Sequence, residues 1–138
     1  MASALGVVQL AKAHSLRAQR ENAALRYFDA LRDLPLDFPA LPPKGSLHSW
    51  HLFPIRIHED ARTTRDEVIA AFSAAGIGSS VHYRPLHQMS YWKERCPSQP
   101  GEFAAADRYF SGAVTLPLFS GMTDAEVERV SSGALQLI

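Results

Sequence analysis

The segment 82–87, with the sequence HYRPLH, holds the densest group of chemically capable side chains in the protein. Two imidazoles, a phenol and a guanidinium lie within six residues, at the expected end of a strand. Such positions commonly carry binding sites. Pro85 sets the chain direction after the strand, so His87 could turn back toward His82. The segment is either a polar wall that donates hydrogen bonds to a ligand, or a surface turn whose polar groups satisfy the local backbone. Spacing alone favours the turn.

Other chemistries find little support in the residues. His82 and His87 lack the i, i+4 helical spacing of a zinc protease, and no cysteine or glutamate completes a ligand set around them or around His48 and His51. We therefore expect no metal site. The sequence also has no nucleophile elbow, P-loop or dinucleotide-binding fingerprint. Cys96 is expected to be a surface thiol without a function.

Composition sets outer limits on the function. The 138 residues fit one domain, and 14 basic residues balance 14 acidic ones, so neither nucleic acid nor an anionic membrane is an expected partner. A single cysteine favours a reducing compartment. No apolar run approaches the roughly 20 residues that span a bilayer, and no secretory signal is recognisable at the start. These features predict a cytoplasmic protein without a membrane-spanning segment.

The first elements that must position the segment are a helix, a loop and a strand. Residues 4–31 contain one potential breaker and carry an apolar face at helical spacing, which predicts a long helix that connects to something else. Residues 33–49 hold four prolines and are expected to be a loop, with extended pieces at best. Residues 50–57 alternate as a strand, and Pro54 favours an edge position or a bulge.

The remaining elements alternate between helix and strand. Thr64 and Glu67 form a capping box for a helix over 64–75, which Gly76 is expected to end in the left-handed conformation. Strands are expected at 77–83 and 114–118, with an irregular stretch at 86–101 and a short helix at 103–110. A second capping box, from Thr123 to Glu126, opens a helix over 123–137. The pattern predicts an α+β fold with about three strands, covered by helices mainly on one face.

Much of the chain resembles one protein family, in order and at matching spacings. The matching segments are ALGVVQL at 4–10, the positions Arg20, Tyr27 and Leu31, WHLF at 50–53, RDE at 65–67, GIG at 76–78, HYRPLH at 82–87, LPLF at 116–119 and GMTD at 121–124. They resemble the C-terminal part of the DegT/DnrJ/EryC1/StrS sugar aminotransferases, which depend on pyridoxal phosphate (PLP). The resemblance implies a connector helix at 1–33, followed by the small C-terminal α+β domain of a fold-type-I PLP enzyme at 34–138, without the large PLP-binding domain.

The resemblance also implies a function for the complete enzyme. Such enzymes move an amino group, usually from glutamate, onto a nucleotide-linked keto sugar, with PLP as the electron sink and a lysine as its Schiff-base partner. None of Lys12, Lys44 and Lys93 lies in the family's lysine motif, so we expect no catalytic residue and no bound PLP in this chain. By resemblance, His82, Tyr83 and His87 face the sugar nucleotide.

Two interpretations remain open at this stage. The chain is either an inactive C-terminal fragment of such an enzyme, or a naturally short, non-catalytic module for binding or assembly. Because the family's members are dimers, we also expect a homodimer. Its contacts are expected on the apolar residues of the first half of the opening helix, namely Leu5, Val8, Leu10 and Leu16.

Overall fold

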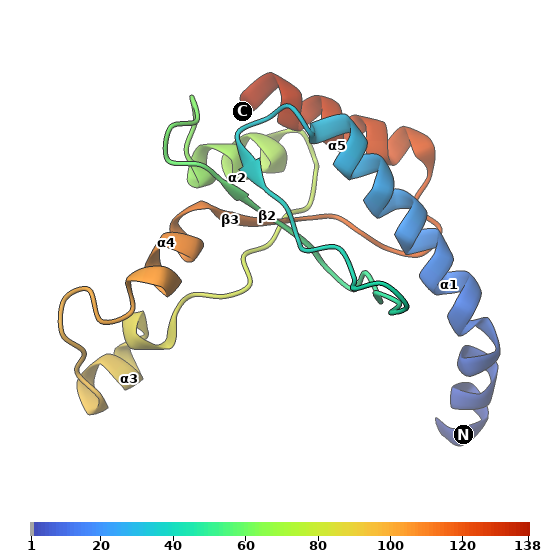
Figure 1. Ribbon diagram of the computed structural model, residues 1–138, viewed down its shortest axis with the longest axis horizontal. Coiled ribbons are helices and arrows are strands. Elements are labelled where there is room, and N and C mark those ends of the chain that lie inside the picture. The colour runs from blue at the N-terminus through green and yellow to red at the C-terminus, as the bar shows by residue number, and fades with distance from the viewer. Residues whose placement is uncertain (1) are drawn as a thin grey trace.

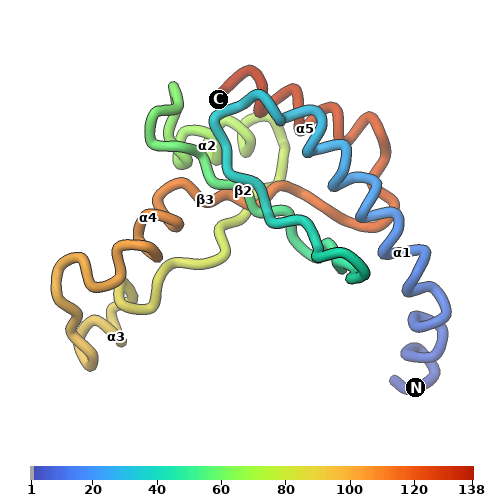
Figure 2. Tube along the Cα trace, in the orientation of Figure 1, coloured from blue at the N-terminus to red at the C-terminus, as the bar shows by residue number. Residues whose placement is uncertain are grey.

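A long helix, α1 (Ala2–Leu31), opens the chain and extends well beyond the other elements (Figures 1 and 2). The computed structural model describes residues 2–138. The first half of α1 is exposed, whereas its second half packs against α5 (Asp124–Leu137) and buries Ala23, Ala24, Tyr27 and Leu31. The buried hydroxyl of Tyr27 donates to the carbonyl of Pro117 at 2.9 Å. The expected long helix is therefore present, and only its second half belongs to the core.

The sheet has three antiparallel strands in the order β1 (Leu36–Asp37), β2 (Phe53–Ile57) and β3 (Ala113–Leu116). The second and third correspond to the expected strands at 50–57 and 114–118. The first is a two-residue extended piece within the stretch 33–49, which was expected to be a loop with extended pieces at best.

An ion-pair cluster accounts for the short first strand. Asp37 accepts hydrogen bonds from Arg56 at 2.6 Å and from His58 at 2.8 Å, and these bonds hold its pKa below the ordinary value. Prolines at positions 35 and 39 flank the strand and have no N–H to donate, although the carbonyl of Pro35 still accepts from the N–H of His58 at 3.0 Å.

Pro54 lies where β2 has only one neighbouring strand. It pairs with Thr115 of β3, whereas β1 reaches only Arg56 and Ile57. Although β2 is the middle strand of the sheet, its first residues form a local edge, where a missing backbone N–H costs no ladder hydrogen bond. The expected edge position of Pro54 is thus found in this local sense.

The expected strand at 77–83 does not form. Only Ser80 joins the sheet, through an isolated bridge in which it exchanges two backbone hydrogen bonds with Thr115, at 2.7 and 3.2 Å. After Ile77, no residue of 78–83 is fully buried, so little apolar burial holds this segment against β3. The alternation of residue types was therefore too weak a signal to predict pairing with the sheet.

Both capping boxes are present as expected. Thr64 caps α2 (Arg65–Ala74) together with Glu67, and Thr123 caps α5 together with Glu126. At the end of α2, Gly76 has φ of 67°, and the N–H of Ile77 donates to Phe72 O at 2.8 Å, which completes a Schellman motif.

Residues 86–112 form a helical lobe that lies apart from the sheet and its covering helices in Figure 1. The lobe contains the 3-10 turn η1 (Leu86–Gln88), α3 (Ser90–Arg95) and α4 (Ala104–Gly112). The expected short helix at 103–110 corresponds to α4. The stretch 86–101 was expected to be irregular, and this was wrong for η1 and α3. Neither element buries a residue, so neither has an apolar stripe that a sequence pattern could reveal.

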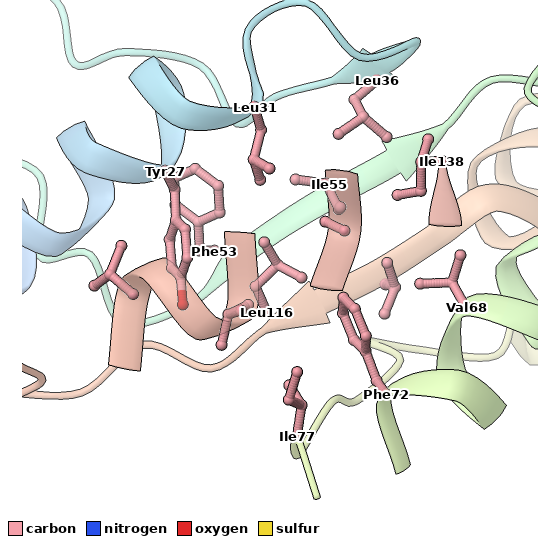
Figure 3. Packing of buried hydrophobic residues seen from close by; sticks show 14 of the residues in the cluster. Tyr27, Leu31, Leu36, Phe53, Ile55, Val68, Phe72, Ile77, Leu116 and Ile138 are labelled. Carbon is pink, nitrogen blue, oxygen red and sulfur yellow. The ribbon is translucent and has the colours of Figure 1, made fainter. Parts of the chain in front are cut away.

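The core lies between one face of the sheet and helices α1, α2 and α5 (Figure 3). Alternate residues of β2, namely Phe53, Ile55 and Ile57, point into it. Val114 and Leu116 of β3 face the same cluster, which leaves Thr115 on the opposite face of the strand. His82, one of the candidate site residues, contacts the strand on that opposite face.

Candidate functional site

His82 is positioned by the third strand. Its Nδ1 atom lies 2.9 Å from the hydroxyl of Thr115, which is itself only 5% exposed. The bridge at Ser80 brings the two residues together, because it fixes the chain two positions before His82 against Thr115. The ring of His82 is therefore held by a contact to the sheet.

Tyr83 projects from the surface. It is 75% exposed, and its ring meets the ring of His82 edge to face, with 4.7 Å between the centroids. A phenol this exposed contributes little to the core. It is available to contact a ligand or another part of a larger protein.

His87 belongs to the helical lobe. Its Nε2 atom lies 2.7 Å from Oδ1 of Asp107 on α4, and the side-chain amide of Gln88 donates to the same oxygen at 2.6 Å. The ring stacks on Phe103, with 4.8 Å between centroids and 29° between planes. A cavity of about 370 Å³ adjoins this cluster and is lined by His87, Gln88, Lys93, Pro97, Ser98 and Asp107.

The two histidines are thus anchored to different elements, one to β3 and the other to α4. Their partners are side chains 33 and 20 residues away in sequence, rather than groups of the neighbouring backbone. The sequence did not identify Thr115, Asp107, Gln88 or Phe103 as their partners. The available signal was slight: Asp107 is an acidic residue in the first turn of a predicted helix, a common position for a purely helical role.

A larger hollow than the one beside His87 lies elsewhere. It measures about 580 Å³ and is lined by residues of α1 and α5, including Leu25, Arg26, Val127 and Leu135. It contains none of the predicted site residues. Cavity volume alone would therefore point to a different binding site from the one formed around His82 and His87.

A PLP site uses a desolvated lysine and a position that binds the phosphate. The side chains of Lys12, Lys44 and Lys93 are all exposed, so none is desolvated as an activated amine requires. The N-termini of α2 and α5 could bind a phosphate only by displacing the carboxylates of Glu67 and Glu126. Hydrogen bonds from the N-cap threonines to these carboxylates lower the pKa of both glutamates, so the anion positions are already filled.

Among residues 2–138, no three or more His, Cys, Asp or Glu side chains gather closely enough to hold a metal ion. None of the helices described combines the length and apolar character needed to cross a bilayer.

Comparison with solved structures places the fold among sugar-modifying enzymes. PseC from Helicobacter pylori, an aminotransferase involved in the biosynthesis of pseudoaminic acid, is 30% identical with a TM-score of 0.84, covering 97% of this chain and 36% of PseC. The PLP form of Spr1654, a putative sugar aminotransferase from Streptococcus pneumoniae, is 26% identical with a TM-score of 0.83, covering 97% and 35%. DesV from S. venezuelae, solved with a ketimine intermediate, is 25% identical with a TM-score of 0.80, covering 94% and 33%.

The chain spans about a third of the length of the solved structures that it matches. The matched third has the same architecture as this chain: a long helix followed by a small α+β unit. The family model for DegT/DnrJ/EryC1/StrS aminotransferases matches residues 1–134, which is nearly the whole sequence. This chain belongs to the DegT/DnrJ/EryC1/StrS aminotransferase family.

Proposed function

We propose that the chain is the C-terminal part of a PLP-dependent enzyme that transfers an amino group from glutamate to a nucleotide-linked keto sugar. The observation that carries the proposal is the family match over residues 1–134, together with solved relatives described as sugar aminotransferases. The chain alone is inactive in this proposal, because its lysines are exposed and the N-termini of α2 and α5 are already capped. The PLP site, with its lysine, belongs to a larger part that precedes it.

In the proposed enzyme, His82, Tyr83 and His87 contact the sugar nucleotide. Three features of these residues support this role. Tyr83 is exposed far beyond what packing requires, His82 is held by a buried hydroxyl, and His87 is held by a carboxylate beside a cavity. Groups whose orientation is fixed by a second layer of contacts are suited to binding a ligand without losing side-chain entropy.

The alternative is a naturally short, non-catalytic module that keeps this domain for binding or assembly. The DNA that precedes the first codon separates the two proposals. An in-frame continuation that encodes a PLP-binding lysine motif is expected here, whereas an immediate in-frame stop codon favours the short module. Purified chain mixed with PLP should give no borohydride-trapped adduct at one defined lysine. A stoichiometric adduct with amino-sugar turnover contradicts the proposal that the PLP site lies outside this chain.

Self-association of the isolated chain belongs to the same proposal. Leu5, Val8 and Leu10 on the first half of α1 are 65%, 52% and 75% exposed, and Leu16 is partly buried. In the complete enzyme this half of the helix contacts the larger part. In the isolated chain, pairing of two copies covers it most simply, because two-fold dimers are the commonest assembly.

Light scattering at micromolar concentration tests the pairing. The wild-type chain should have the mass of a dimer, and Val8→Glu combined with Leu5→Glu should give a monomer. Leu135→Glu on α5 is the matched control, since Leu135 is 51% exposed but lies outside the proposed interface. A monomeric wild type, or a dimer that survives the double substitution, contradicts the pairing.

We also propose that the protein is cytoplasmic, because a single cysteine favours a reducing compartment.

A further inference from the structure

The contact between Asp107 and His87 determines which ring nitrogen of His87 is free. Oδ1 of Asp107 lies 2.7 Å from Nε2 of His87. A carboxylate can only accept hydrogen bonds, so the imidazole must carry a proton on Nε2 and donate it. In the neutral ring, Nδ1 is then an acceptor, and it is the nitrogen left for a further partner.

Two more contacts fix the orientation of the ring. Gln88 donates to the same Asp107 oxygen at 2.6 Å, so two neighbouring side chains of η1 converge on one atom of α4. Phe103, one helical turn before Asp107, stacks against the ring and restricts its plane. The backbone N–H of Asp107 also donates to Phe103 O at 3.0 Å, so the two residues move as one unit.

The exposure of the pair indicates that folding stability is not its main effect. The side chain of Asp107 is 42% exposed and that of His87 is 17% exposed. Pairs this close to solvent contribute little to stability. A fixed tautomer and ring direction, in contrast, matter greatly for a group that must recognise a ligand.

From these contacts we infer that Asp107 is a positioning residue for His87, which presents Nδ1 as a hydrogen-bond acceptor to a hydroxyl group of the sugar. The inference rests on the proposed role of His87 toward the sugar nucleotide. It specifies the direction of the bond: the sugar hydroxyl donates and the neutral imidazole accepts. The adjoining cavity of about 370 Å³, which Ser98 and Lys93 also line, is the space available to that ligand.

Nuclear magnetic resonance of the ¹⁵N-labelled chain, at a pH where free imidazole is neutral, tests the contact without requiring activity. The Nε2 proton of His87 should be visible as a resonance protected from exchange with water, and Nδ1 should have the shift of an unprotonated nitrogen. Asp107→Ala should abolish that protected proton. Asp107→Asn should retain it, because the side-chain carbonyl still accepts. Gln88→Ala is the control that removes the other donor and leaves the resonance in place.

The wild-type spectrum is decisive even if a variant does not fold. A folded wild type without a protected Nε2 proton overturns the inference, and so does a proton that persists unchanged in folded Asp107→Ala. In a complete family enzyme, the equivalent Asp107→Ala should raise KM for the keto sugar about tenfold, as expected for one lost hydrogen bond, without raising KM for glutamate.

The binding role of His87 and the positioning role of Asp107 can be rejected independently of each other. If His87→Ala leaves sugar turnover unchanged, the proposed function of His87 is rejected while the resonance result stands. If His87→Ala impairs turnover but Asp107→Ala does not, the positioning role is rejected and the function of His87 remains.

Discussion

Gly112 joins the helical lobe to the sheet, and its replacement by alanine should strongly destabilise the protein. It is the last residue of α4, and a Cβ atom at this position would lie 2.3 Å from the carbonyl oxygen of Ile57 and 3.0 Å from Cγ of Arg56. The nearer neighbour is backbone within β2, so it cannot rotate away. To move from 2.3 Å to a separation of 3.0 Å, α4 and β2 must part by about 0.7 Å.

The expected cost follows from two opposing effects. Overpacking against fixed neighbours costs about 1–3 kcal/mol, with larger values where backbone must move. Replacing a helical glycine by alanine returns roughly 0.5–1 kcal/mol through helix propensity. We expect the steric effect to dominate, with a net loss of about 2 kcal/mol. For a chain of this length that corresponds to a fall in Tm of roughly 6–10 °C.

Thermal unfolding followed by circular dichroism measures this loss. Gly78→Ala is the matched control, because a Cβ atom there meets nothing within 4 Å, and its Tm should remain within about 2 °C of wild type. Gly112→Ala should also reduce the protection of the His87 Nε2 proton from exchange with water, because Asp107 lies on the displaced helix α4. The steric reasoning is refuted if Gly112→Ala melts together with Gly78→Ala.

Three further predictions concern the caps and the buried tyrosine. Thr123→Ala removes a capping box and should lower the free energy of unfolding by about 1 kcal/mol in urea titrations, and an unchanged midpoint argues against a formed cap. The pKa values of Glu67 and Glu126 are lower in the folded state than the ordinary 4.5, so the folded protein binds fewer protons than the unfolded chain. The contribution of the two carboxylates to stability is therefore full above about pH 4.5 and is lost as the pH falls through the folded pKa values. The double substitution to glutamine should therefore flatten the acid side of the stability curve, and an unaltered slope contradicts this. Burial raises the pKa of Tyr27 well above its ordinary value. Tyr27→Phe leaves Pro117 O without its donor and should lower the free energy of unfolding by about 1–2 kcal/mol. An unchanged free energy of unfolding indicates that water replaces the phenol.

The sequence predicted elements well where local chemistry is sufficient to define them. The capping boxes at Thr64 and Thr123 and the left-handed Gly76 are found as expected, because each motif is satisfied by residues within a few positions of itself. The pairing of residues 77–83 was overestimated, because alternation does not report whether a neighbouring strand is long enough or apolar enough to pair. The helices of the lobe were partly missed because α3 buries nothing.

The candidate site could be predicted only in part for a related reason. The segment 82–87 was recognisable by its residue types, and its resemblance to the family marked the same positions. The partners of its histidines, Thr115 and Asp107, lie on elements brought close only by the fold, and neither residue type is unusual on a strand or helix. Which histidine nitrogen is free was therefore a property that only the three-dimensional arrangement could reveal.

The central claim is that residues 82–87 bind the sugar nucleotide in a complete PLP-dependent aminotransferase. Amination of a keto-sugar nucleotide by a complete family enzyme, measured with glutamate as donor, tests it most directly in the variant equivalent to His87→Ala. The account predicts that turnover falls by about tenfold or more, in line with a lost substrate contact, while Tm stays well above that of the variant equivalent to Ile77→Ala, which empties part of the core. Unchanged turnover, or a fall in Tm as large as that of the core variant, would contradict the claim.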